Sequence, residues 1–124
     1  MQYLLLIYTD DTLIDGLAEG EYDTMMRGCL EHADALQAQG TLVGFQQLEP
    51  ASTAKTLRTR GGRTQVFDGP FSETKEMLAG FNLIEADSEE EALRIAREFP
   101  WARTGSIEVR PVRNVAQVRT RVGA

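Results

Sequence analysis

The sequence predicts a single α+β domain in which two helices cover one face of a mainly antiparallel sheet. Its 124 residues are 42% hydrophobic, which suits one domain with one core. Two stretches carry apolar residues at the three- and four-residue spacing of an amphipathic helix, and short extended runs lie around them. The order strand, helix, strand, hairpin, strand, helix, strand is that of the ferredoxin-like arrangement.

The chain opens with a short apolar run from Tyr3 to Tyr8, which Asp10 and Asp11 end. An uninterrupted run of this length predicts a strand buried on both faces. The next segment changes to helical periodicity and has Gly40 as its stop signal. The predicted apolar stripe of this helix comprises Tyr22, Met25, Met26, Cys29, Leu30, Ala33 and Leu36.

The middle of the chain returns to extended structure. Residues 42–45 predict a second strand, and residues 55–60 and 63–67 predict the two arms of a hairpin. Gly61–Gly62 between these arms supplies the positive φ angles that a tight hairpin turn requires. Residues 81–85 predict the next strand.

A second helix and a last strand complete the predicted domain. Ser88 and Glu91 form a capping box at the start of this helix, and Pro100 ends it. Ile107 and Val109 alternate with charged residues, which predicts the last strand. A sheet with both helices on one face leaves its other face bare, and we expect a second copy of the chain to cover that face.

Charge is distributed unevenly along the chain. Thirteen basic and 19 acidic side chains give a net charge of −6, which argues against nucleic acid or an anionic membrane as a partner. Residues 1–26 hold six acids and no Lys or Arg, whereas residues 109–124 hold four Arg and no acid. We favour two separate solvated surfaces; the alternative is that the two ends meet, within a chain or across a dimer. Patterning weakens after Val112, so we assign residues 1–112 to the domain and 113–124 to a flexible or partner-contacting extension.

The chain has one cysteine, Cys29, and one histidine, His32. One cysteine excludes an intrachain disulfide, and structural zinc sites use four Cys or His ligands, so we expect no metal and no organic cofactor. Cys29 lies on the apolar stripe, where we interpret it as a small buried hydrophobe. The first apolar run is too short to cross a membrane and has no basic flank, which predicts a cytoplasmic protein.

The segment Asp68–Glu76 is unusually rich in special residues. Asp68 can cap a turn, Gly69 is conformationally free and Pro70 has a fixed φ. We expect the apolar Phe71 to point inward. Five polar side chains follow: Ser72, Glu73, Thr74, Lys75 and Glu76. A turn needs only two or three such residues, so the segment predicts a site.

These residues also carry a family resemblance. The run "DGPFSETKE", followed by "LAGFNLIEADSEEEAL" and "GSIEVRPV", and the opening "YLLLIY", resemble the DGPF branch of the YCII-related family over residues 1 to about 112. The resemblance implies a ferredoxin-like fold of the dimeric α/β-barrel type, with a cleft beside the motif and a function that is mostly unassigned.

The resemblance implies two kinds of role. Some relatives in the wider group resemble small lyases that use a histidine and an aspartate, but the matching positions here hold Cys29 and, near the helix end, Ala38. Other relatives resemble proteins encoded beside, or fused to, extracytoplasmic-function sigma factors. That association implies regulation of transcription through a protein partner.

We therefore consider two hypotheses. The first is a small-molecule enzyme with acid–base groups His32, Asp68, Lys75 and Glu76, and ligand contacts from Gly69, Pro70, Phe71, Ser72 and Thr74. For His32 we favour a half-buried structural role over that of a base paired with Asp68 or Glu76. The second is a non-catalytic ligand-binding or regulatory protein. An enzyme predicts that these side chains line one pocket, whereas a regulatory module predicts an exposed apolar patch near the loop.

Overall fold

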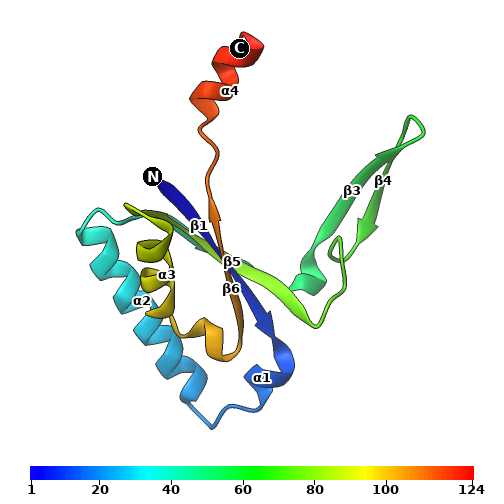
Figure 1. The fold of residues 1–124 in the computed structure, drawn as a ribbon. Coiled ribbons are helices and arrows are strands. Elements are labelled where there is room, and N and C mark those ends of the chain that lie inside the picture. The colour runs from blue at the N-terminus through cyan, green and yellow to red at the C-terminus, as the bar shows by residue number, and fades with distance from the viewer.

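The computed structural model describes all 124 residues and confirms the predicted succession of strands and long helices along the chain. Four antiparallel strands form the main sheet in the order β2-β5-β1-β6. These strands are β1 (Gln2–Asp10), β2 (Leu42–Gln47), β5 (Glu76–Glu85) and β6 (Gly105–Pro111). Figure 1 shows the sheet crossing the centre of the molecule, with both long helices on one side of it.

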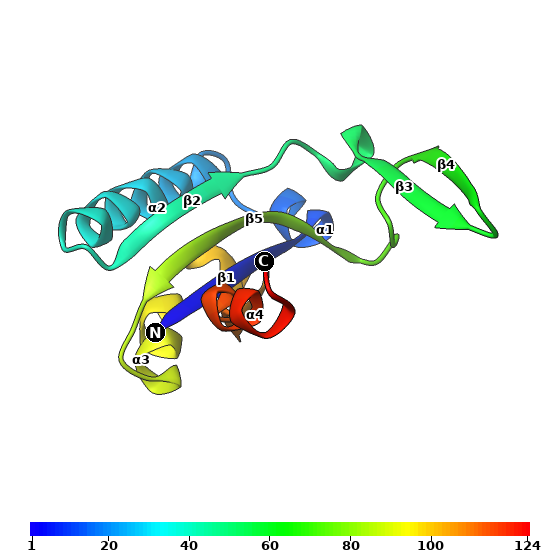
Figure 2. The same cartoon turned by 90° about the horizontal axis from the view of Figure 1, so that it is seen from above.

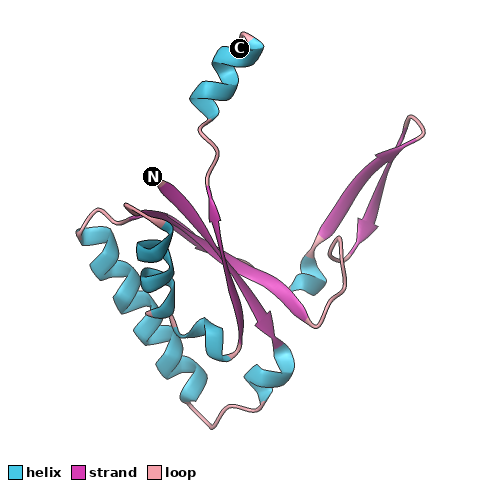
Figure 3. Ribbon diagram, in the orientation of Figure 1, coloured by secondary structure: helices cyan, strands magenta, loops and turns pink.

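The two predicted helices are confirmed as α2 (Glu21–Ala38) and α3 (Glu89–Arg97). They lie on the same side of the sheet, so their apolar stripes form one core with the strands (Figure 3). Helix α2 buries Met25, Cys29, Ala33 and Leu36, all from the predicted stripe. At the start of α3, Ser88 Oγ accepts a hydrogen bond from the Glu91 amide at 3.1 Å, as the capping box predicts.

Only one face of β1 is buried, which differs from the predicted burial on both faces. Tyr3, Leu5 and Ile7 face the helices and are at most 6% exposed. The alternate positions face the other way, where no element of the chain covers them, and they remain half-buried. This open face carries Leu4, Leu6 and Tyr8 from β1 and, by register, Phe81 and Leu83 from β5.

The predicted hairpin forms a separate two-stranded sheet of β3 (Lys55–Arg60) and β4 (Arg63–Asp68). Gly61 and Gly62 join the arms with φ angles of 56° and 76°, which a residue with a side chain rarely adopts. The hairpin extends away from the domain on the side of the sheet opposite α2 and α3 (Figures 1 and 2). Every residue of β4 is exposed.

Several elements lie outside the prediction. Helix α1 (Asp11–Asp15) is a single turn, too short to show periodicity, and Asp10 caps it. Two short 3₁₀ helices, Ala51–Thr53 and Pro100–Arg103, were also not predicted. Strand β5 starts at Glu76 instead of 81, and helix α4 (Val115–Val122) forms within the C-terminal extension. No helix is both long enough and apolar enough to cross a membrane.

Candidate functional site

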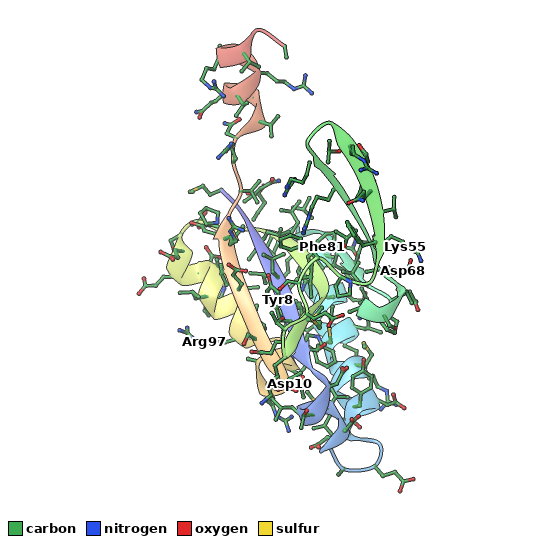
Figure 4. All side chains as sticks on the ribbon, turned by 90° about the vertical axis from the view of Figure 1, so that its right-hand side faces the viewer. Tyr8, Asp10, Lys55, Asp68, Phe81 and Arg97 are labelled. Atoms are coloured by element: carbon green, nitrogen blue, oxygen red, sulfur yellow. The ribbon has the colours of Figure 1, made fainter.

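The first part of the predicted site segment holds the base of the hairpin. The Gly69 amide donates to the Ala54 carbonyl at 2.7 Å, and the Gly69 carbonyl accepts from Thr56 Oγ1 at 2.9 Å. The Asp68 carboxylate pairs with Lys55 Nζ across the two strands, and both side chains are exposed. Figure 4 shows this pair at the base of the hairpin. Asp68 and Gly69 therefore fix where β3 and β4 join the domain.

The prediction that Phe71 points inward is wrong. Its side chain is 76% exposed, and the Arg58 guanidinium lies 5.6 Å from the centre of its ring. Because the Gly69 amide is bonded to the hairpin, the chain leaves the domain at this point and Phe71 has no core to enter. A cation–π contact with Arg58 is the interaction that the ring makes instead.

The second part of the segment reaches the buried carboxylate of Asp10, which the sequence pattern marks only as the end of a strand. Lys75 Nζ lies 3.5 Å from Asp10 Oδ2, and the Asp10 side chain is 6% exposed. Glu76 pairs directly with Asp10 in the β1–β5 register, and its Oε1 accepts from Ser106 Oγ at 2.8 Å. Thr74 Oγ1 donates to the Glu76 carbonyl. We name Asp10, Lys75, Glu76 and Ser106 the Asp10 cluster.

Helix α1 and the residue ahead of β6 hold Asp10 in place from both sides. Asp10 Oδ1 accepts from the Thr12 amide at 2.9 Å and so caps α1. The Asp10 amide donates to the Thr104 carbonyl at 2.8 Å, ahead of β6. The carboxylate thus joins the end of β1, the start of β5 and the start of β6.

His32 lies elsewhere, between α2 and α3. Its Nε2 is 3.2 Å from Glu98 Oε2, without hydrogen-bond geometry, and its ring packs edge-on against Phe99 at 4.7 Å. The carboxylate beside His32 is therefore Glu98, and neither Asp68 nor Glu76 contacts it. The structure does not bring the predicted acid–base residues to one point.

A cavity of about 370 Å³ lies between α2 and the sheet, and we name it the α2–sheet cavity. Thirteen of its 21 lining residues are hydrophobic, which favours an apolar occupant. Four aromatic residues line it, Tyr22, Phe45, Phe81 and Trp101, and the rings of Tyr22 and Trp101 lie 5.8 Å apart at 44°. None of the residues predicted as catalytic or ligand-binding lines the cavity, although Met77, directly after the segment, does.

Asn82 is the unusual residue of the α2–sheet cavity. It lies on the central strand β5, on the side facing the helices, and is 6% exposed. No hydrogen bond within the protein uses its side-chain amide, whose atoms remain accessible from the cavity. The amide can therefore bond a ligand or a water molecule in the cavity. Its signal in the sequence is a polar residue at an inward position of an otherwise apolar strand.

Cys29 also lines this cavity. Trp101 Nε1 donates to Cys29 Sγ at 3.2 Å. Burial raises the pKa of the Cys29 thiol, and the Trp101 hydrogen bond opposes that increase. The group is therefore a protonated thiol at neutral pH. No three His, Cys, Asp or Glu side chains converge so that they could hold a metal ion.

Comparison with known proteins identifies relatives over nearly the whole chain. The sequence profile of the YCII-related domain matches residues 1–116. An uncharacterised protein of Rhizobium meliloti (strain 1021) is 40% identical over 114 residues, covering 90% of this chain and 92% of its own. Among solved structures, 5-chloro-2-hydroxyhydroquinone dehydrochlorinase of Burkholderia phenoliruptrix AC1100, in complex with 2,5-dihydroxybenzoquinone, is similar. It matches with a TM-score of 0.46 and 14% identity, over 92% of this chain and 95% of that one.

Proposed function

The chain belongs to the family of YCII-related domains, and from that premise we propose that it binds a small flat molecule in the α2–sheet cavity. The observation that carries this proposal is Asn82, a largely buried residue whose amide makes no hydrogen bond within the protein and lies in a cavity lined by four aromatic residues. A volume of about 370 Å³ falls within the usual range for small-molecule sites. Such sites combine apolar walls with a few placed polar groups.

The chemistry of the walls indicates the class of ligand. Tyr22 and Trp101 pack against each other and present aromatic surface to the cavity, which favours an aromatic or unsaturated ring beside them. The Asn82 amide can donate to a carbonyl and accept from a hydroxyl of the same ring. No Lys or Arg lines the cavity, so a strongly anionic ligand has no counter-charge there. We therefore propose a neutral ring that bears oxygen substituents.

Acid–base chemistry is the second element of the proposal. The groups that support it are Lys75 and Glu76, because they meet the buried Asp10. This cluster lies at the end of β1 and the start of β5, whereas Asp68 and His32 have other partners. The proposed binding groups and the proposed proton-transfer groups are thus separate, and binding without catalysis is the form of the proposal that we place first.

Replacing Asn82 by Leu tests the binding proposal with two effects of opposite sign. Replacing this amide by an apolar group in a mostly hydrophobic cavity is expected to stabilise the empty protein by about 1 kcal/mol, raising Tm by about 4 °C. The same change removes the hydrogen bonds to the ring, so the dissociation constant should rise about 10-fold. Thermal shift against a panel of phenols, quinones and hydroxylated ring acids measures both.

The control for this experiment is Gln65→Leu, which removes a side-chain amide from the exposed strand β4. It should leave Tm and the ligand-induced shift unchanged. A ligand whose thermal shift survives Asn82→Leu binds elsewhere and would remove the proposal. An Asn82→Leu protein that is less stable than the wild type would show that the amide has a partner in solution.

A homodimer is the assembly that we propose. The open face is apolar at its centre, where Leu4, Leu6, Phe81 and Leu83 lie on adjacent strands. Figure 4 views this face and labels Phe81, Tyr8 and Asp10 along it. Large exposed apolar patches mark interfaces, and a second sheet packed face to face would cover this one.

Leu4→Asp is expected to convert the dimer into a monomer of 13.8 kDa by light scattering. Arg110 lies directly opposite Leu4 on β6, so the new carboxylate gains a cross-strand partner and the fold is retained. Leu30→Asp, on the exposed side of α2, is the matched control and should leave the dimer intact. A wild-type protein that is monomeric at micromolar concentration would contradict the proposal.

A regulatory function through a protein partner, such as a sigma-factor-related protein, is the second candidate. The observation that favours it is an exposed apolar patch beside the predicted site: Leu57 and Val66 pair across the hairpin at 68% and 65% exposure, and Phe71 is near them in sequence. Leu57→Asp, measured by light scattering, shows whether a different protein or a second copy of this chain covers the patch. The dimer persists if a different protein covers the patch and weakens if the second copy does.

A further inference from the structure

Helix α4 (Val115–Val122) has no partner within the chain. It has eight residues, none of them buried, although isolated helices shorter than about 12 residues are marginal in water. Val115, Val118 and Val122 recur at helical spacing and form one apolar stripe, with Val115 and Val122 58% and 56% exposed. A short helix with an uncovered stripe requires a surface to dock on.

The charges around α4 indicate what that surface is. Arg113, Arg119 and Arg121 make no ion pair, and no acidic residue occurs from Val109 to the end. The opposite charge is concentrated between positions 10 and 23, which we name the acidic segment. Four of its acids have no cationic partner: Asp11, Asp15, Glu19 and Asp23. Leu13, in the middle of this segment, is 48% exposed and offers apolar surface.

These two surfaces cannot meet within one chain. Pro111 pairs with Tyr3 at the first end of β1, and α4 follows just beyond that end. Helix α1 starts directly after Asp10, at the other end of β1. Nine residues of strand span about 30 Å. Figures 1 and 4 accordingly show α4 and α1 at opposite ends of the molecule.

We propose that α4 docks on the acidic segment of a second copy of this chain. A two-fold axis that lies between two facing sheets and perpendicular to β1 places the first end of one β1 over the last end of its partner. In that arrangement the valine stripe meets Leu13, and the arginines meet Asp15 and Glu19. The contact occurs twice in the dimer, as two-fold symmetry requires. This inference rests on the dimer proposed above.

Charge exchange between two variants tests whether the contact forms between chains. One variant is Arg119→Glu/Arg121→Glu and the other is Asp15→Lys/Glu19→Lys; all four positions are exposed, so folding should be unaffected. In each homodimer both contacts then join like charges, and the dissociation constant should rise about 10-fold. In a mixture of the two variants both contacts of the heterodimer join opposite charges, so affinity should return to that of the wild type.

The outcomes separate this inference from the dimer itself. Sedimentation is measured at low salt and at about 1 M salt, where the Debye length is about 3 Å. The differences in dissociation constant between the variants and the wild type should be smaller at high salt. A wild-type dimer whose dissociation constant is unaltered by both variants would overturn the α4 contact and leave the dimer. A monomeric wild type would overturn both. Variants that weaken the dimer, but whose mixture does not regain the wild-type affinity, would also overturn the α4 contact.

Discussion

Replacing Gly105 by Ala is expected to destabilise the protein by about 3 kcal/mol, because the added methyl group would collide with backbone. A Cβ at this position would lie 1.9 Å from the Tyr8 carbonyl oxygen and 2.9 Å from Thr9 Cα. Backbone atoms of β1 cannot move aside easily, since β1 also pairs with β5 along its whole length. We expect the collision to be relieved by separation of β6 from β1 near Ser106.

Urea denaturation with a constant m value measures this effect. Gly28→Ala provides the matched control, because Gly28 is exposed in the middle of α2 and a Cβ there meets nothing within 4 Å. In a helix interior the same substitution should stabilise by about 0.5–1 kcal/mol. Equal effects at the two positions would show that β6 does not approach β1 as closely as the structure has it.

Loss of the β1–β6 contact would also disturb the Asp10 cluster. The Asp10 amide is bonded to the Thr104 carbonyl, and Ser106 donates to Glu76. Both bonds depend on how closely the start of β6 lies against the end of β1. The Asp10 cluster therefore requires a small residue at position 105, as the sheet does.

The sequence could predict the elements whose pattern repeats, and it could not predict the site that single residues form. Helix α2 and the Gly61–Gly62 turn follow from periodicity and backbone freedom alone. Asp10 and Asn82 depend on which strands become neighbours, because their significance lies in contacts across the sheet. Helix α4 was missed because its three valines have low helix propensity, so local preference gave little signal.

The site segment shows the same division between local and long-range effects. Its density of polar and special residues directed attention to Lys75 and Glu76, which the structure places beside the buried Asp10. It did not indicate that Phe71 would be exposed, since the inward direction assumed a domain surface that the hairpin base does not provide. Whether the segment acts on a ligand stays a prediction.

Trp101→Ala is expected to destabilise the protein by about 3–4 kcal/mol, since the side chain is 6% exposed and fills the space between the core and the α2–sheet cavity. The same change would enlarge the cavity and remove one aromatic wall. Binding of a flat ring should therefore weaken together with stability. Calorimetry of the unfolding transition and titration with a ligand found for the wild type measure the two losses.

Trp101→Phe separates the ring from its hydrogen bond. Phe keeps an aromatic wall but cannot donate to Cys29 Sγ, and that bond lowers the thiol pKa. The pKa of Cys29, already raised by burial, should therefore rise further, and the pH midpoint of its alkylation should move upward. The midpoint distinguishes this effect from a change in access, which alters the rate at every pH.

The raised thiol pKa also has a consequence for stability. The folded protein holds the Cys29 proton more tightly than the unfolded chain does. The resulting stabilisation is full below the pKa of the unfolded thiol and decreases as the pH rises through the pKa of the folded one. Trp101→Phe should widen the pH range between these two pKa values, over which stability is lost, whereas Cys29→Ala should abolish this pH dependence. A pH dependence that persists in Cys29→Ala would assign the effect to another group.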